Sequence, residues 1–185
     1  MKQKGNWMIE SSAKVYENPR ISVYSEKGKQ PDGKEGEHTY IVYKPGVAVL
    51  PMDEEGNVYL IREFRYAIGE KSVEAVAGGI EEGDTPLEGA KKELREELGI
   101  TATEWEELGV YHPLTETVFT PSTFFIARGL SFEKQDQEGT EDIEIVKMKL
   151  SDAVKKVISG EINFALAGLL ILIANEKYSS LQNKK

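Results

Sequence analysis

Three glutamates lie close together in the run KKELREELG, which covers residues 91–99. Glu93 precedes Glu96 by three positions and Glu97 by four, and these are the spacings at which side chains become neighbours on a helix. With a turn of roughly 100° per residue, the three carboxylates fall within an arc of about 100° on one side of the helix. Mg²⁺ prefers oxygen ligands and commonly shares its coordination between protein carboxylates and substrate phosphates. The spacing therefore indicates a cradle for a divalent ion that could act on a phosphate compound.

The same run also fits an ordinary helix face. Lys91, Lys92 and Arg95 alternate with the glutamates, and such a mixture usually forms a solvated surface laced with salt bridges. Carboxylates three or four positions apart repel one another, and anions are disfavoured near the C-terminus of a helix. A bound cation would offset both effects. The choice between the two interpretations depends on the surrounding sequence.

The helix that must carry the glutamates is predicted over residues 86–98. Asp84 or Thr85 can cap its N-terminus, and Pro86 suits the first helical position, where its missing N–H needs no partner. Gly99 suits a left-handed stop. One apolar stripe is expected to pack on a sheet, and it consists of Leu87, Ala90, Leu94 and Leu98.

Strands are expected on both sides of this helix along the chain. They are predicted at 47–51, 58–65, 73–79, 105–111, 122–127 and 142–150, with loops at 81–84, 113–121 and 132–140. Ser151 is expected to cap a helix that ends near Gly160, and a more apolar helix follows from about residue 162. Short β-prone runs at 21–24 and 38–43 predict a small N-terminal sheet.

The composition limits the class of protein. With 185 residues, 39% apolar and 30% charged, the chain suits one globular domain with its own core. It contains no cysteine, which excludes a disulfide framework and a thiolate metal site, and it starts without the apolar segment of a secretory signal, so we expect a cytoplasmic protein. The net charge of −9 opposes nucleic acid as a partner, although cations within one cleft can still attract a small anion. The longest apolar stretch, 162–174, is shorter than the roughly 20 residues of a membrane span, and it predicts a buried helix or a dimer contact.

From Gly78 onward the sequence reads GGIEEGDTPLEGAKKELREELGI and resembles the Nudix box. That motif has a glycine, five residues, an acid, seven residues, and then a basic residue, Glu, an aliphatic residue, any residue, Glu-Glu, any residue, Gly and an aliphatic residue. The matching positions are Gly78, Asp84, Lys92, Glu93, Leu94, Glu96, Glu97, Gly99 and Ile100. Asp84 stands where the family usually has glutamate, and Lys92 stands where it usually has arginine. Both keep the charge, but a shorter acid and a lysine without the planar fork predict looser orientation of the glutamates and a lower turnover.

Further segments resemble the ADP-ribose pyrophosphatase (nucleotide-sugar pyrophosphatase) branch of this family. They are YLIREFR, VEAVAGGIEEG, EDIEIVKMKLSDAVKKVISGEI and the final apolar helix. The resemblance implies an α/β fold, a Nudix-type α/β/α sandwich around a mixed sheet, with a small N-terminal β-sheet. It also implies an N-terminal β subdomain over residues 1–44 that serves as a dimerisation arm, a Nudix hydrolase domain over residues 45–185, and a homodimer.

The resemblance also implies which residues hold the metal. Mg²⁺, or Mn²⁺ as a substitute, would be held by Glu93, Glu96, Glu97 and the backbone carbonyl of Ala77. Glu96 would belong to the catalytic set as well as to the ligands. Lys92 would help to orient the glutamates.

The base that activates the attacking water would be an acid in the loop before the strand at Ile143. Glu141 matches best, and Glu138 and Glu144 are close rivals. Glu144 fits equally well as an outward-facing strand residue, because it alternates with apolar positions.

Other residues are candidates for substrate contacts. Arg65 matches the family arginine that meets the substrate phosphates, and a guanidinium suits that task; the alternative is a surface arginine paired with a nearby acid. Glu74 could hydrogen-bond the base or the ribose, or it could face solvent, and Gly78 would lie beside the substrate. Trp7 and Tyr24 could stack on adenine, with packing in a core or a dimer as an equal alternative.

The resemblance thus implies metal-dependent hydrolysis of the pyrophosphate bond of ADP-ribose or a related nucleotide sugar, yielding a nucleoside monophosphate and a sugar phosphate. The small-molecule substrate is the expected partner, with no nucleic acid and no membrane. His112, Pro113 and Leu114 stand where the ADP-ribose enzymes often have Ser-Pro-Gly, so GDP-mannose or another nucleoside diphosphate derivative stays open. Two alternatives of other classes remain: a weakly active or inactive Nudix-fold nucleotide-binding sensor, and an interaction domain with an ordinary acidic helix.

Overall fold

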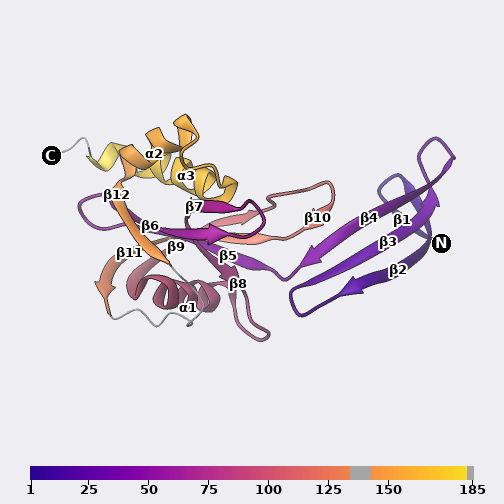
Figure 1. Cartoon of the computed structure of the whole chain (residues 1–185), viewed down its shortest axis with the longest axis horizontal. Helices are drawn as coiled ribbons and strands as arrows, with labels where there is room; N and C mark the ends of the chain where they lie inside the picture. The colour runs from indigo at the N-terminus through magenta and orange to yellow at the C-terminus, as the bar shows by residue number, and fades with distance from the viewer. Residues whose placement is uncertain (134–142, 183–185) are drawn as a thin grey trace. The chain divides into compact units, whose positions relative to one another are not determined.

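The structure, a computed structural model, describes residues 1–133 and 143–182, and Figure 1 labels its elements. The chain divides by its contacts into two compact units. The N-terminal unit comprises Met1–Pro45 and His112–Pro121, and the main unit comprises Gly46–Tyr111 and Ser122–Lys185. The sequence divides the chain after residue 44, whereas the contacts divide it after Pro45 and add residues 112–121 to the N-terminal unit.

The N-terminal unit contains a five-stranded sheet with the order β1-β2-β3-β4-β10. Its strands are β1 (Lys2–Lys4), β2 (Trp7–Glu17), β3 (Ile21–Lys29), β4 (Glu35–Tyr43) and β10 (Val118–Phe119). The first four strands pair antiparallel, and β10 pairs with β4 in parallel, with Val118 opposite Ile41. The sequence does not predict β1 and β2, because β2 has no clean alternation and is exposed at every position except Trp7 and Ile9.

The described residues of the main unit form two sheets. One has the order β8-β5-β11-β9 and the other has the order β12-β6-β7. The strands are β5 (Gly46–Pro51), β6 (Asn57–Arg65), β7 (Glu70–Glu74), β8 (Val76–Gly79), β9 (Ile100–Tyr111), β11 (Ser122–Phe132) and β12 (Glu144–Lys149). Because β5 and β11 pair in parallel while their other neighbours pair antiparallel, the first sheet is mixed.

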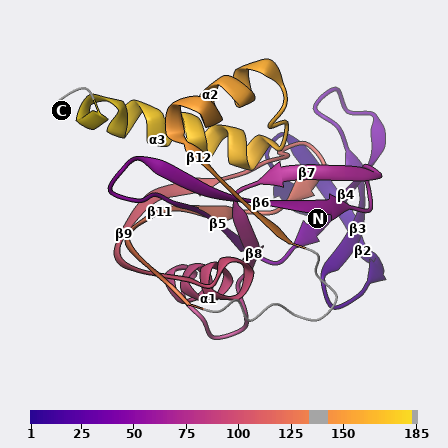
Figure 2. The ribbon, with the colours of Figure 1, turned by 60° about the vertical axis from the view of Figure 1, so that its left-hand side comes forward.

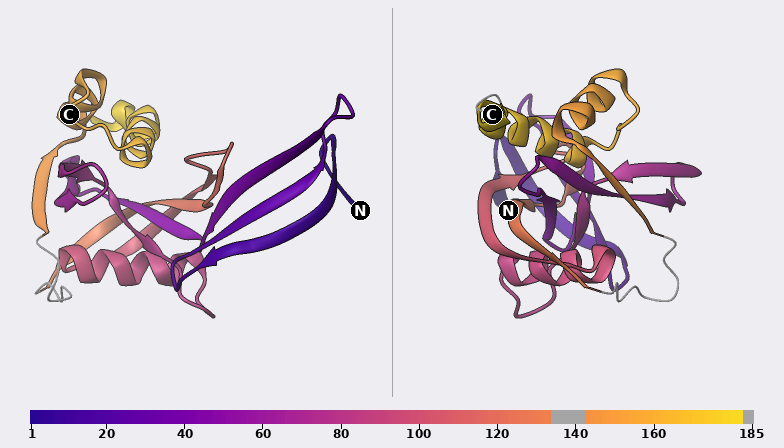
Figure 3. Two further views of the ribbon diagram at one scale, coloured as in Figure 1. Left: turned by 45° about the vertical axis from the view of Figure 1, so that its right-hand side comes forward. Right: turned by 90° about the vertical axis from the view of Figure 1, so that its left-hand side faces the viewer.

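Helices cover both faces of the main unit. They are α1 (Pro86–Leu98), α2 (Leu150–Ser159) and α3 (Ala165–Gln182). Figures 2 and 3 show α1 on one side of the sheets and α2 with α3 on the other. The neighbours Leu60 and Ile61 point to opposite faces of β6, so Leu60 packs in the core below α2 and α3 while Ile61 packs in the core below α1. The predicted α/β/α sandwich around a mixed sheet is therefore confirmed. Among the described residues, no helix combines the length and the hydropathy needed to cross a bilayer.

The helix that carries the glutamates spans the predicted residues because local signals define both of its ends. The Thr85 hydroxyl accepts a hydrogen bond from the Glu88 N–H at 3.3 Å, and the Glu88 carboxylate accepts one from the Thr85 N–H at 2.8 Å. Such a reciprocal cap satisfies two backbone donors at once. Gly99 ends the helix with φ 62° and ψ 30°, a left-handed conformation that glycine adopts without steric cost.

The prediction for the start of α2 is wrong. Ser151 is not its cap: the helix begins at Leu150, and Lys149 occupies the capping position without a side-chain hydrogen bond. Leu150 is fully buried, and its N–H donates to the carbonyl of Gly56 at 3.0 Å. Packing within the main unit therefore sets the start of this helix. α3 likewise begins at Ala165 rather than near residue 162, because Ile162 is buried within the connection between the two helices.

Candidate active site

The glutamates of α1 differ in exposure. Glu93 and Glu96 are half-buried, whereas Glu97 is only 8% exposed. Leu94 and Leu98 are buried in the core below the helix, so α1 is held firmly against the sheet. A carboxylate as buried as that of Glu97 requires hydrogen bonds or a cation nearby to offset its lost hydration.

Gly78 on β8 lies directly against the Glu93 side chain. A Cβ atom at position 78 would sit 2.0 Å from both the carboxyl carbon and Oε1 of Glu93. The absence of a side chain at this glycine is therefore what allows the carboxylate to approach the backbone of β8. Ala77, whose carbonyl is the predicted backbone ligand, is the preceding residue of the same strand and pairs with Ala48 of β5. The strand and the helix thus bring the glycine, the carbonyl-bearing residue and Glu93 into one place.

Arg65 and Glu74 form a two-point ion pair between β6 and β7. The arginine Nε donates to Oε1 of Glu74 at 3.1 Å, and Nη2 donates to Oε2 at 2.8 Å. Glu74 is only 4% exposed, so the solvent-facing alternative for this residue is excluded. Its hydrogen bonds are the largest cause that raises the pKa of Arg65, and the charges of Glu74, Glu63 and Glu97 raise it further against the opposing effect of burial. The pairing of Arg65 with a nearby acid is therefore present, and its contact with phosphate stays a prediction.

Lys92 pairs with Glu81 in the loop between β8 and α1. This hydrogen bond is the largest cause that raises the pKa of Lys92, and the charges of Glu96 and Glu93 also raise it. Lys92 therefore lies within electrostatic reach of two of the glutamates that it is predicted to orient. The sequence does not single out Glu81, because the box pattern leaves its position free. The only available signal is the acidic character of the loop.

The candidates for the base divide between described and undescribed parts of the chain. Glu141, the best match, and Glu138 lie outside the described residues. Glu144 is exposed on β12 and accepts a hydrogen bond from Arg62 at 2.9 Å. It has the outward-facing strand position that the alternation predicts.

The residues around Gly78 fit a hard divalent ion in chemistry. Glu93 is seated against the strand backbone, Glu97 is buried, and carboxylate and carbonyl oxygens are the ligands that Mg²⁺ takes. Within residues 1–133 and 143–182, no three acidic, histidine or cysteine side chains are already assembled into a metal-binding group.

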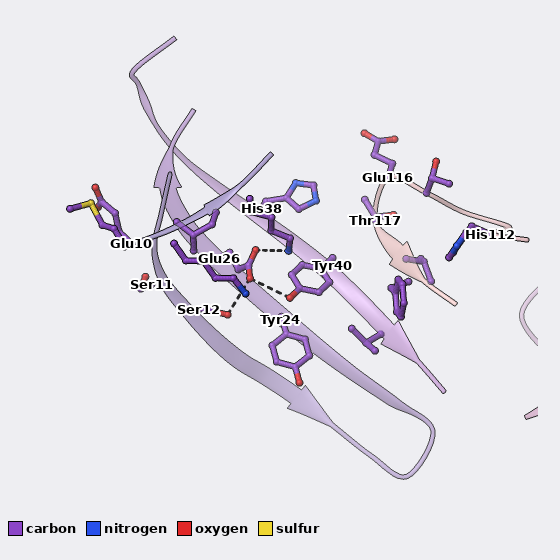
Figure 4. Close-up of a pocket in the computed structure, with 18 residues that line it drawn as sticks. Glu10, Ser11, Ser12, Tyr24, Glu26, His38, Tyr40, His112, Glu116 and Thr117 are labelled. Atoms are coloured by element: carbon purple, nitrogen blue, oxygen red, sulfur yellow. Dashed lines mark hydrogen bonds and ion pairs between the residues drawn. The ribbon is translucent and has the colours of Figure 1, made fainter. Parts of the chain in front are cut away.

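The N-terminal unit contains a separate hollow of about 1010 Å³. It is lined by strands β1 to β4 and by residues between 112 and 119, and it includes both histidines of the chain, His38 and His112. Figure 4 shows Glu26 among the lining side chains, joined to its neighbours by dashed lines. The Glu26 carboxylate accepts hydrogen bonds from Lys4 at 2.8 Å, from the Tyr40 hydroxyl at 3.3 Å and from Ser12 at 3.4 Å.

These contacts make Glu26 a structural link within the sheet. The residue is 8% exposed, and its partners come from β1, β2 and β4. Tyr24 stacks on Tyr40 with ring centroids 5.4 Å apart, and Trp7 lies 6.3 Å from the ring of His38. Both predicted stacking residues therefore make aromatic contacts within their own sheet. Stacking on adenine stays a prediction.

Replacing Glu26 by Gln is expected to lower the free energy of unfolding by about 1 kcal/mol, because a charged acceptor of several hydrogen bonds is lost. The hydrogen bond from Lys4 is the largest cause that lowers the pKa of Glu26 below its usual 4.5. A group whose folded pKa is lowered stabilises the fold above its unfolded pKa and loses that effect as the pH falls through the folded pKa. Urea unfolding at pH 7 and at pH 3 should therefore show a gap between wild type and variant that narrows in acid. An unchanged gap would contradict the assigned charge.

Comparisons with known proteins agree with this arrangement. A sequence model of the NUDIX domain matches residues 42–162. The chain is 29% identical over 150 residues to an ADP-ribose pyrophosphatase of Bacillus subtilis (strain 168), covering 80% of this chain and 81% of that protein. It is 24% identical over 169 residues to an ADP-ribose pyrophosphatase of Mycobacterium tuberculosis, covering 89% and 82%. A solved structure of an ADP compounds hydrolase superposes with a TM-score of 0.82 at 18% identity and covers 98% of both chains, which shows a common fold.

Proposed function

The chain belongs to the NUDIX family, whose model covers more than half of its length, and from this membership we propose that it hydrolyses the pyrophosphate bond of ADP-ribose or a related nucleotide sugar. The products would be a nucleoside monophosphate and a sugar phosphate. The observation that carries the proposal is the seating of the Glu93 carboxylate against Gly78, beside the buried Glu97, within the family's own motif. The two ADP-ribose pyrophosphatases support the choice of substrate class.

The proposal requires a divalent ion, Mg²⁺ with Mn²⁺ as a substitute. Glu93, Glu96 and Glu97 would hold it together with the carbonyl of Ala77. When bound, such an ion neutralises charge on the pyrophosphate and lowers the pKa of a bound water. Lys92, paired with Glu81, would limit the swing of Glu93 and Glu96, which follow it on the helix.

The chain's other groups would bind and orient the substrate. Arg65 would meet the phosphates, since a guanidinium offers several N–H donors in one plane. Gly78 would leave room beside them, because a Cβ there would already strike Glu93. Glu141 would take a proton from the attacking water as general base.

The assembly and the location belong to the proposal as well. We propose a homodimer in which the N-terminal unit is the dimerisation arm. Exposed apolar side chains on its sheet support this, namely Val15 at 58%, Tyr16 at 53% and Tyr43 at 42% exposure. The cytoplasmic location stays a prediction from the sequence.

A substrate panel tests the proposed activity. ADP-ribose, GDP-mannose, UDP-glucose and NADH are incubated with excess Mg²⁺, and monophosphate release is measured. We expect the fastest release from ADP-ribose and none when EDTA replaces Mg²⁺. Preference for another compound would keep the chemistry and change the substrate. Binding of ADP-ribose without release, in a protein with a normal thermal melt, would instead favour the nucleotide-binding sensor, while failure to bind or cleave any compound would contradict the proposal.

A further inference from the structure

We propose that Glu74 is a positioning residue that locks the orientation of the Arg65 guanidinium, and that Glu63 is a displaceable carboxylate whose place the substrate phosphate takes. The inference rests on the proposed function of the site and assigns two carboxylates opposite effects on phosphate binding. The three side chains concerned are Glu63 and Arg65 on β6 and Glu74 on β7.

Glu74 occupies one defined edge of the guanidinium. It accepts hydrogen bonds from Nε at 3.1 Å and from Nη2 at 2.8 Å, which is the side-on, two-point geometry of a strong arginine–carboxylate pair. A guanidinium has five N–H donors in one plane. The edge formed by Nη1 and Nη2 therefore keeps donors for a second oxyanion. The direction of this edge is fixed as long as Glu74 holds the adjacent edge formed by Nε and Nη2.

Glu63 pairs with one nitrogen of that second edge. Its Oε2 is 2.8 Å from Nη1 of Arg65. Glu63 and Arg65 are two positions apart on β6 and so share one face of the strand. A phosphate that approaches Nη1 and Nη2 therefore competes with Glu63 for Nη1, whereas Glu74 can keep its place at Nε and Nη2.

Burial decides which carboxylate can leave. The Glu74 side chain is 5% exposed, whereas that of Glu63 is 20% exposed and that of Arg65 is 36% exposed. A buried carboxylate that loses its cation pays a large desolvation penalty, but a more exposed one can turn into water. Glu74 therefore stays with the arginine when a ligand arrives. Glu63 moves.

The charges around the guanidinium support the same division. Two carboxylates face one cation, and Glu97 of α1 adds a third negative charge within electrostatic reach. The surroundings of Arg65 are thus more negative than a phosphate site should be. Displacing Glu63 removes part of the repulsion between these carboxylates and an incoming phosphate. Losing Glu74 would instead leave the Arg65 guanidinium free to rotate.

Two isosteric variants separate the roles, because Glu63→Gln and Glu74→Gln each remove one negative charge from the same guanidinium. The dissociation constant of ADP-ribose is measured by calorimetry in EDTA, where turnover does not interfere, and kcat and KM follow with Mg²⁺. We expect Glu63→Gln to tighten binding severalfold, since a competitor is removed. We expect Glu74→Gln to weaken it about tenfold, since charge-assisted hydrogen bonds that orient the arginine are lost. Thermal melts check that both variants fold.

The same two glutamine substitutions, made in an Arg65→Lys protein, test whether the glutamates act through the guanidinium. Lysine lacks the planar fork, so a residue that acts through the guanidinium should lose its effect there, and both glutamine variants should then bind ADP-ribose as the Arg65→Lys protein does. If Glu74→Gln still weakens binding in this background, Glu74 touches the ligand itself and the inference is wrong. It is also wrong if the two variants shift affinity in the same direction, or if neither shifts it.

The inference and the proposed function can fail separately. A wild-type protein that binds ADP-ribose in EDTA, shows the two opposite shifts and cleaves nothing with Mg²⁺ would refute the function and keep the inference. A wild-type protein that binds neither ADP-ribose nor inorganic pyrophosphate would refute the inference, because Arg65 would then meet no phosphate.

Discussion

Replacing Glu97 by Gln is expected to reduce kcat for ADP-ribose at least about 100-fold, because one of the carboxylates that would hold the divalent ion loses its charge. Metal-assisted stabilisation of a transition state amounts to several kcal/mol, and each 1.4 kcal/mol corresponds to a factor of ten in rate. Glu97 is 8% exposed and its helix is packed in the core, so a glutamine of the same shape should remain in place. The readout is kcat across a titration of Mg²⁺, accompanied by a thermal melt.

Glu176→Gln is the matched control for this variant. Glu176 is an exposed glutamate on α3, the helix on the opposite side of the sheets from α1 (Figure 3). Its replacement changes the net charge equally and should leave kcat unchanged. If Glu97→Gln retains the rate and the Mg²⁺ dependence of the wild type, α1 is an ordinary acidic helix.

Gly78→Ala is expected to lower kcat about 100-fold while leaving the fold intact, because the new Cβ would lie 2.0 Å from the Glu93 carboxyl group. The atoms that would clash with this Cβ are the carboxyl atoms at the end of the flexible Glu93 side chain. Glu93 can therefore swing away at little cost to stability. It then leaves its place by an ångström or more, and misplacement of a catalytic group by about 1 Å costs on the order of 100-fold in rate. Steady-state rates and the Mg²⁺ concentration for half-maximal activity measure the effect.

The neighbouring glycine gives a control of equal chemistry. A Cβ at Gly79 would meet no atom within 4 Å, so Gly79→Ala adds the same methyl group to the same strand without displacing Glu93. Its rate should be close to that of the wild type. Equal activity of the two alanine variants would mean that the position of the Glu93 carboxylate does not matter for catalysis.

The part of the fold that local signals determine could be predicted from the sequence. The helix α1 has the expected ends because each end is determined by neighbouring residues. The capping box at Thr85 sets the start, and the left-handed Gly99 sets the end. The start of α2 could not be predicted in this way. There the burial of Leu150 and its hydrogen bond to Gly56 outweigh the capping preference of Ser151, and both depend on residues distant in sequence.

Pairing between segments that are distant in sequence also could not be predicted from periodicity. Residues 113–121 are predicted as a plain loop, yet β10 within them pairs with β4. A two-residue strand carries no pattern of its own. The long strand β2 could not be predicted for a different reason. Most of its residues are exposed, and neither face is apolar enough to produce an alternating pattern.

The candidate site shows the same division between local and distant effects. The spacing of the glutamates predicts that they share one side of a helix, and Gly78 belongs to the same continuous motif. The pairing of Arg65 with Glu74, and of Lys92 with Glu81, depends on how strands and loops are brought together. Glu63 could have been suspected from its position two residues before Arg65, which places both side chains on one face of a strand.

The most direct measurement is hydrolysis of ADP-ribose in water enriched in ¹⁸O, with products analysed by mass spectrometry in the presence of Mg²⁺ or EDTA. With Mg²⁺, we predict AMP and ribose 5-phosphate in equal amounts, with a single ¹⁸O atom carried by one of the two, since water attacks one phosphorus and the bridging oxygen leaves with the other. With EDTA, we predict no product. An intact substrate under both conditions, or cleavage that proceeds equally well without a divalent ion, would contradict the proposal that α1 holds a metal for pyrophosphate hydrolysis.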